Sequence, residues 1–374
     1  MSDTVSKGLE GVVIADSAIC TIDGQKGILR YRGIDIADLA PRTTYEETVY
    51  LLWFDELPTR QQLDAFRSEL AAQRELHDSV WTMMTSFPCW PQPMEALRTA
   101  VSALSSCDPN AGEETPEANL AKAKYLLAKL PTIVAYYWRH SNGKERVHPD
   151  PKLSHAANFL YMLRGERPAP LEERAMDLAL VLMAEHEMNA STFAARVTSS
   201  TLSDMYSAIT SAIGTLKGPL HGGANARAME MLHEIGDAGA AEAYIDNALA
   251  GKKRLMGFGH RIYKTTDPRA AILRGMLCEM DAQAENPHWC HLALAVADLV
   301  HKKKGLYPNV DFFSAPLLYN LGISTELFTP IFALSRVAGW TAQVREQYQD
   351  NRLIRPLSRY VGREDRAYVP MGER

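Results

Sequence analysis

Two histidines of the sequence lie between glycines, in segments that would connect helices. His221 stands in Gly218-Pro-Leu-His-Gly-Gly-Ala-Asn225, and His260 stands in Met256-Gly-Phe-Gly-His-Arg-Ile-Tyr-Lys264. Small neighbours allow a ligand to approach both the imidazole ring and the backbone. A single histidine at a helix end is more often a cap or a buried structural group, but the shared glycine setting favours a function for both. The cationic residues that continue the second segment to Arg269 indicate an anionic ligand.

A carboxylate in an apolar setting is the third candidate. Asp311 lies in Pro308-Asn-Val-Asp-Phe-Phe-Ser-Ala-Pro316, among aromatic and aliphatic residues. Loss of solvent would raise the pKa of this carboxyl and make it a stronger base. The alternative is structural, since Asp311 could simply cap a helix that begins at Phe312.

Metal binding is a competing use for histidines. The one tight cluster is His288-Trp-Cys-His291, in which the two histidines are three positions apart and no HExxH or comparable motif is present. We therefore predict no metal site, and a structural or surface role for this cluster.

The segments that must position these residues have a mostly helical period. Met205 to Leu216 is the clearest case, with Ser203 or Asp204 as the cap and Gly218-Pro219 as the stop. Similar apolar faces recur at 44–53, 93–104, 120–138, 155–163, 171–184, 226–235, 241–249, 268–280, 291–300 and 326–347. Asp267 and Pro268 would be the N-cap and first residue of one of these helices.

Two further segments refine this picture. The run Leu171 to Ala184 is apolar on nearly every side from Leu178 onward, which predicts a helix surrounded by protein. Near the N-terminus, Ala18 to Ile22 and Ile28 to Tyr31 flank Asp23-Gly24 and predict a short hairpin, for which a type I′ turn is one option. The sequence thus predicts an all-α protein with a short N-terminal β-hairpin.

Composition excludes several classes of protein. A length of 374 residues predicts about two domains. The 40 basic and 45 acidic residues give 40 − 45 = −5, and 46% hydrophobic with 23% charged residues is typical of a globular protein. This charge provides no overall field for nucleic acid or an anionic membrane, so any phosphate site must be local. We interpret the run His301 to Lys304 as a solvated helix end, and a phosphate contact is the alternative.

Cysteine usage and the N-terminal residues bear on the compartment. The five cysteines are an odd number at irregular spacing without a CxxC pair, which favours a reducing compartment. The first ten residues carry charges and no apolar signal region, and no run of 18 apolar residues occurs without a charge. We expect a cytoplasmic protein, and the alternative is one that enters an organelle without a recognisable presequence.

Taken together, the three candidate segments resemble the signature segments of the citrate synthase family. GPLHGGAN, GFGHRIYKTTDPRA and NVDFFSAPLLYNLGI occur in this order. Further segments resemble the family at 8–11, 31–35, 184–192, 327–340 and 350–356, so that the resemblance covers nearly the whole chain in its short bacterial and archaeal form.

This resemblance implies a two-domain, mostly helical homodimer. Residues 1–221 and 322–374 would form the large dimerisation domain, and residues 222–321 the small domain with the coenzyme A and catalytic loops. The implied reaction condenses acetyl-CoA with oxaloacetate and water to give citrate and CoA, without a metal or other cofactor. A 2-methylcitrate synthase, which uses propionyl-CoA, is the alternative, because one methylene is worth only about 1–3 kcal/mol in a pocket.

The resemblance also implies residue roles. His221 would bond the thioester carbonyl of acetyl-CoA, Asp311 would take a methyl proton, and His260 would polarise the keto oxygen of oxaloacetate. The remaining matches are oxaloacetate contacts at His186, Arg269 and Arg336, an arginine that reaches the partner subunit's site at Arg355, and a coenzyme A contact at Lys264.

Elementary chemistry supports the same roles. A thioester methyl group is a far weaker acid than a carboxyl group, so its deprotonation needs a donor placed at the enolate oxygen. Planar arginines suit a dicarboxylate because each can bond a carboxylate with two N–H groups. One departure from the family pattern is Ala226-Arg227 after the HGGAN motif, where relatives usually carry an acidic residue.

Two other classes of function are less favoured. A binding or scaffold protein on this fold would lack the chemistry of the loops, whereas His221, His260 and Asp311 are all present. A metal hydrolase would need a different spacing of histidines.

Overall fold

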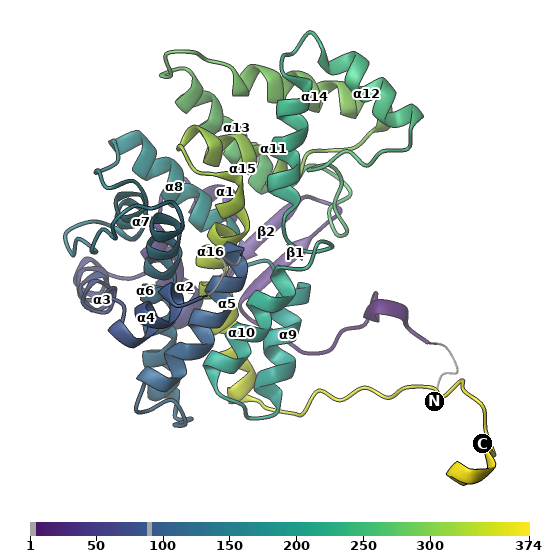
Figure 1. Cartoon of the computed structure of the whole chain (residues 1–374). Helices are drawn as coiled ribbons and strands as arrows, with labels where there is room; N and C mark the ends of the chain where they lie inside the picture. Colours follow the sequence, from purple (N-terminus) through teal and green to yellow (C-terminus); the bar gives the residue numbers. More distant parts are fainter. Residues whose placement is uncertain (1–4, 88–91) are drawn as a thin grey trace.

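The computed structural model describes residues 5–87 and 92–374 and is mostly helical (Figure 1). Its described part holds one small antiparallel sheet, in the order β1 (Cys20–Asp23), β2 (Ile28–Tyr31), β3 (Ile34–Asp35). Cys89 lies outside the described residues. The all-α prediction with a short N-terminal hairpin is therefore confirmed.

The α-helices fall into two groups in space (Figure 1). The larger group contains α1 (Ile36–Leu39), α2 (Tyr45–Phe54), α3 (Arg60–Ala72), α4 (Asp78–Thr85), α5 (Pro93–Leu104), α6 (Pro116–Ser141), α7 (His155–Arg164), α8 (Pro170–Met183), α9 (Ala190–Ser200), α10 (Met205–Leu216) and α16 (Phe328–Gln349). The smaller group contains α11 (Ala224–Ile235), α12 (Ala241–Ala250), α13 (Pro268–Asp281), α14 (Trp289–Lys304) and α15 (Val310–Asn320). Short 3-10 turns occur at Lys7–Leu9, Ser105–Cys107, Thr325–Leu327 and Met371–Glu373.

The larger group is built around α16. This helix is buried along most of its length and packs against α2, α6, α8, α9 and α10. Helix α8 is fully buried from Ala179 to Met183, as the apolar run predicted, and lies against α16 and α13. The C-terminal end of α8 and the middle of α16 therefore meet inside the protein, where the Gly339 N–H of α16 donates to the Ala184 carbonyl over 3.2 Å.

Predicted helical segments are confirmed to within about one helical turn. Helix α10 begins after an Asp204 cap, and α13 has Asp267 as its N-cap and Pro268 in its first turn. The run His301 to Lys304 forms the last turn of α14, next to the negative end of the helix dipole. Five helices had not been predicted as such: α1, α3, α4, α9 and α15.

The hairpin differs from the expected type I′ geometry. Its strands pair Cys20 with Tyr31 and Asp23 with Ile28, so the connection has four residues, Gly24 to Gly27. Only Gly27 among its glycines has a positive φ, of 66°. The Asp23 carboxylate accepts hydrogen bonds from the backbone N–H groups of Gln25 and Lys26, and this closes the longer loop.

None of the helices in the described part of the chain is both long and apolar enough to cross a membrane.

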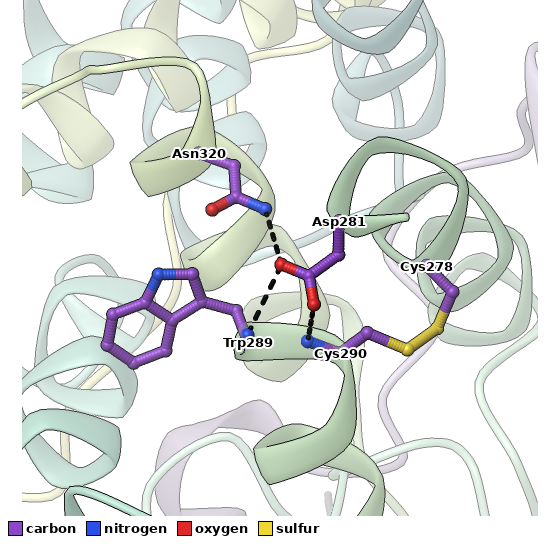
Figure 2. The surroundings of a disulfide bond; sticks show 5 residues. All are labelled: Cys278, Asp281, Trp289, Cys290 and Asn320. Carbon is purple, nitrogen blue, oxygen red and sulfur yellow. Dashed lines mark hydrogen bonds between the residues drawn. A yellow bond between two sulfur atoms is a disulfide. The ribbon is translucent and has the colours of Figure 1, made fainter. Parts of the chain in front are cut away.

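A disulfide joins two helices of the smaller group (Figure 2). Cys278 near the end of α13 bonds Cys290 at the start of α14, with the two Cα atoms 5.0 Å apart. The buried Asp281 carboxylate lies beside this bond and accepts from the N–H groups of Trp289 and Cys290 and from the Asn320 amide of α15. The sequence, interpreted as that of a reducing compartment, had not predicted this pair, because the helices bring together cysteines without a recognisable motif.

We predict that this disulfide stabilises the fold. A disulfide between cysteines 12 positions apart lowers the conformational entropy of the unfolded chain, and this raises the free energy of unfolding by about 3 kcal/mol. Replacing both cysteines, Cys278→Ser with Cys290→Ser, should lower the melting temperature by a few degrees in calorimetry. Cys107→Ser, at a cysteine without a disulfide, is the control. Equal melting temperatures for the oxidised wild type and the double variant would contradict the prediction.

Candidate active site

One cavity of about 710 Å³ brings together six of the residues predicted from the sequence. They come from both groups of helices and are His186, His221, His260, Arg269, Asp311 and Arg336. Residues that are up to 150 positions apart in the chain thus face a single space, as a shared substrate site requires.

His221 is oriented by the N-terminus of α9. The backbone N–H of Ser191, in the first turn of that helix, donates to His221 Nε2 over 3.3 Å. Because Nε2 accepts this bond, the proton of the neutral ring is on Nδ1, which can donate to a ligand. Burial, with a smaller effect of the Arg336 charge, lowers the pKa of His221 to about 4. His221 is therefore a neutral hydrogen-bond donor at physiological pH.

Ser191 is a site residue that the sequence analysis did not single out. Its hydroxyl accepts from the Trp340 indole N–H and lies 2.8 Å from His221 Nε2 and 2.7 Å from Asn189 Oδ1, so its single proton can be donated to either of these two acceptors. Ser191 is buried, and this network fixes its side chain. Residues 184–192, which include Ser191, resembled a segment of the family, but only the folded chain shows which of these residues contacts His221.

His260 is held in the opposite tautomer. Its Nδ1 accepts from the backbone N–H groups of Ile262 and Tyr263, at 3.1 and 3.2 Å. The proton of the neutral ring is therefore on Nε2. Burial, followed by the nearby Arg269 charge, lowers the pKa of His260 to about 4. His260 is thus a second neutral donor in the cavity.

Asp311 lies in the first turn of α15. The N-cap of that helix is Asn309, whose side chain accepts from the Asp311 N–H, so the alternative in which Asp311 itself caps the helix is wrong. Burial raises the pKa of Asp311 to about 6, although the charge of Arg269 opposes this rise. Its carboxylate is consequently ionised at neutral pH and more basic than an exposed one.

Arg269 is fixed before any ligand arrives. It is buried, and its Nε and one terminal nitrogen donate to the two oxygens of Asp267, at 3.0 and 2.8 Å. The same carboxylate accepts from the backbone N–H of Val310, which begins α15. Asp267 was predicted as a helix cap, and its ion pair with Arg269 is an additional role.

Arg336 enters the cavity from α16. It is buried, its Nε donates to the Met183 carbonyl over 2.7 Å, and its guanidinium lies 4.7 Å from the Phe332 ring centre. Behind it is the buried Glu185, whose pKa burial raises to about 7 while the Arg336 charge lowers it. Glu185 Oε1 accepts from the Gln343 amide.

His186 lies where these elements meet. Its Nε2 is 3.3 Å from the Tyr263 hydroxyl, and its ring centre is 5.3 Å from that of His260. Burial and the charges of Arg269 and Arg336 lower the pKa of His186 well below its usual range. Three neutral imidazoles and two guanidinium groups therefore surround one space.

Two predicted residues do not line this cavity. Lys264 is exposed, and its Nζ donates to the Arg261 carbonyl in the loop beside it. Arg355 is exposed on an extended C-terminal segment that leaves the body of the protein (Figure 1). Arg227, the departure from the family pattern, donates to the carbonyls of Pro219 and Gly223 and so bonds the loop that carries His221.

This arrangement suits proton abstraction next to a carbonyl group. One basic carboxylate and two neutral N–H donors can remove a proton and stabilise the oxygen on which charge develops. Two buried arginines suit a small dianion. In the described part of the chain, no three His, Cys, Asp or Glu side chains are grouped as metal ligands.

Comparison with known proteins gives a consistent result. The family described as "Citrate synthase, C-terminal domain" matches residues 8–357. The citrate synthase of Haloferax volcanii is 50% identical over all of both chains, and the 2-methylcitrate synthase 1 of Corynebacterium glutamicum is 42% identical, also over all of both. Among solved structures, citrate synthase of Thermoplasma acidophilum in a ternary complex with carboxymethyl coenzyme A and oxaloacetate superposes with a TM-score of 0.92, at 37% identity over all of both chains.

We predict opposite tautomers for the two donor histidines. In ¹⁵N NMR of the histidine side chains, His221 should carry its proton on Nδ1 and His260 on Nε2 at pH 7. Because each pKa is lowered to about 4, both rings should stay neutral as the pH falls to about 5. An imidazolium signal from either residue at pH 7 would contradict this assignment.

Proposed function

The chain belongs to the citrate synthase family, and we propose that it condenses acetyl-CoA with oxaloacetate and water to give citrate and CoA. The observation that carries this proposal is the single cavity in which His221, His260 and Asp311 face one another beside two buried arginines. The protein is thus an enzyme of the condensing acyltransferase type.

The first step is formation of the enolate. The Asp311 carboxylate takes a proton from the methyl group of acetyl-CoA, while the Nδ1–H of His221 bonds the thioester oxygen on which negative charge develops. A neutral imidazole is suited to this role because it donates an N–H hydrogen bond without first having to be protonated. The pKa of about 6 matches Asp311 to a base that works near neutral pH.

The second step joins the two substrates. The enolate carbon attacks the keto carbon of oxaloacetate, and the Nε2–H of His260 donates to the keto oxygen as it gains charge. Arg269, Arg336 and His186 would hold the carboxylates and fix the face that is attacked. Water then hydrolyses the citryl thioester and releases CoA. The proton that Asp311 takes from the methyl group balances the proton that the new hydroxyl group needs, and the two imidazoles stabilise the charge on the two oxygens. The proposal therefore includes no metal or other cofactor.

The coenzyme would enter from the side of the loop that carries His260, residues 256–267, which we call the His260 loop. Lys264 and Arg261 are exposed on this loop, and Leu220 beside His221 is 96% exposed. Cationic side chains next to an exposed apolar one suit the phosphates and the pantetheine arm of coenzyme A. Lys264 is the residue that we assign to the coenzyme.

We predict that, with oxaloacetate present, CoA is released faster from acetyl-CoA than from propionyl-CoA, by at least about tenfold in kcat/KM. The reason is the higher sequence identity to a citrate synthase than to a 2-methylcitrate synthase. A faster rate with propionyl-CoA would make the protein a 2-methylcitrate synthase.

Asp311→Asn should lower kcat at least about 100-fold with little change in oxaloacetate binding, since the base does not contact oxaloacetate. A folded Asp311→Asn protein with near wild-type kcat would remove Asp311 from the mechanism.

A second copy of the chain would complete the site. Asn351 and Ile354 bond Ser200, and the residues that follow them extend from the body of the protein (Figure 1). Several apolar side chains of this segment are exposed. Leu357 is 77% and Val361 84% exposed. A single chain leaves this apolar surface in water, whereas a homodimer would bury it and bring Arg355 to the neighbouring cavity.

We predict that two inactive variants complement each other. A dimer of an Arg355→Ala chain with an Asp311→Asn chain contains one site with neither defect. Mixing the two proteins under conditions that exchange subunits should therefore restore part of the activity. Exchange without any recovery would place Arg355 in its own chain's site or outside both sites.

A further inference from the structure

We propose that the β1–β2 hairpin positions the two histidines of the oxaloacetate site, because its turn seats the His260 loop and its opposite end holds the segment before His186. This inference rests on the proposed function and adds positioning residues to it. The hairpin lies between the two groups of helices, with its turn directed toward the smaller group (Figure 1).

The turn meets the His260 loop backbone to backbone. The Lys264 N–H donates to the Gly24 carbonyl over 2.9 Å. A Cβ atom at Gly24 would lie 2.3 Å from the Ile262 oxygen, and one at Gly27 would lie 2.8 Å from the Thr266 oxygen. No side chain fits between the hairpin turn and the His260 loop, so the two glycines determine how closely the loop approaches the hairpin. Ile262 is also the residue whose N–H holds His260 Nδ1.

The other end of the hairpin meets the segment before His186. Tyr31 is fully buried, and its hydroxyl donates to the Glu185 carbonyl over 2.9 Å and accepts from the Glu185 N–H over 3.2 Å. A tyrosine at the end of β2 thus holds both backbone groups of the residue that precedes His186. Cys20, its partner in the ladder, is buried next to it.

The hairpin consequently links two loops that are distant in sequence. Its hydrogen-bonded strands keep Tyr31 and Gly24 at a fixed separation, and the loops at its ends carry rings only 5.3 Å apart. The contact at Gly24 is backbone to backbone and has no side chain that could rotate away, and the Tyr31 side chain at the other end is held by complete burial. A methyl group at Gly24 would have to displace the His260 loop by about 1 Å, a shift that can cost about 100-fold in rate.

The test is Gly24→Ala with Gly112→Ala as the matched control. Both glycines have a φ that alanine adopts readily, but a Cβ at Gly112 meets nothing within 4 Å. We expect Gly24→Ala to lower kcat by about ten- to 100-fold. The ¹³C signal of the keto carbon of bound oxaloacetate, which reports polarisation by His260, should shift toward its value in free solution. Gly112→Ala should keep the wild-type rate and chemical shift.

Hydrogen exchange gives a readout that needs no substrate. The Lys264 amide, which the Gly24 carbonyl holds, should exchange faster in Gly24→Ala than in the wild type or in Gly112→Ala. Lack of citrate formation by the wild type would refute the proposed function, whereas the exchange of Lys264 would still test the contact. Wild-type kcat, keto-carbon shift and Lys264 exchange in a folded Gly24→Ala protein would overturn the inference.

If Gly24→Ala does not fold, Tyr31→Phe decides the question from the other end. Phenylalanine keeps the buried ring and removes only the hydroxyl that holds Glu185. We expect KM for oxaloacetate to rise at least fivefold through misplacement of His186, with a smaller change in kcat. An unchanged KM in the folded variant would overturn the inference.

Discussion

The Asp267 carboxylate is the constraint on which the geometry of the candidate site depends. It caps α13, pairs with Arg269 and accepts the first N–H of α15, so one buried group fixes the start of two helices. Arg269 and Asp311 lie in the first turns of those helices. An anion-binding group and a base are thereby placed relative to each other by backbone and by one ion pair, and little side-chain freedom remains to be lost when a ligand binds.

Burial then sets the protonation of the site. The same loss of solvent that lowers the pKa of His221 and His260 to about 4 raises that of Asp311 to about 6. The buried arginines act in the same direction on the imidazoles, since a second positive charge beside them is unfavourable. At neutral pH the two imidazoles are therefore uncharged donors while Asp311 is an ionised base, and no group has to be prepared by a separate proton transfer.

Much of this could be predicted from the sequence, and the failures have physical causes. Helices with one apolar face, such as α5 and α10, were predicted at their observed ends. Helix α3 buries only three apolar side chains and so has a weak period, whereas α15 is buried along nearly its whole length and contains Pro316, which obscures the period altogether. In the site, residues set between glycines or capping a helix carry a local signal. Ser191 has none, because its role comes from His221, thirty positions later in the chain.

The disulfide in the smaller group of helices has a consequence for the topology of the chain. Residues 282–287 between its cysteines are all exposed, and Asp281 already holds the start of α14. While the bond between Cys278 and Cys290 is intact, the peptide connection from α13 to α14 is a second, redundant link. The chain can therefore be opened in this loop, by a protease or by circular permutation, and the two helices remain covalently joined.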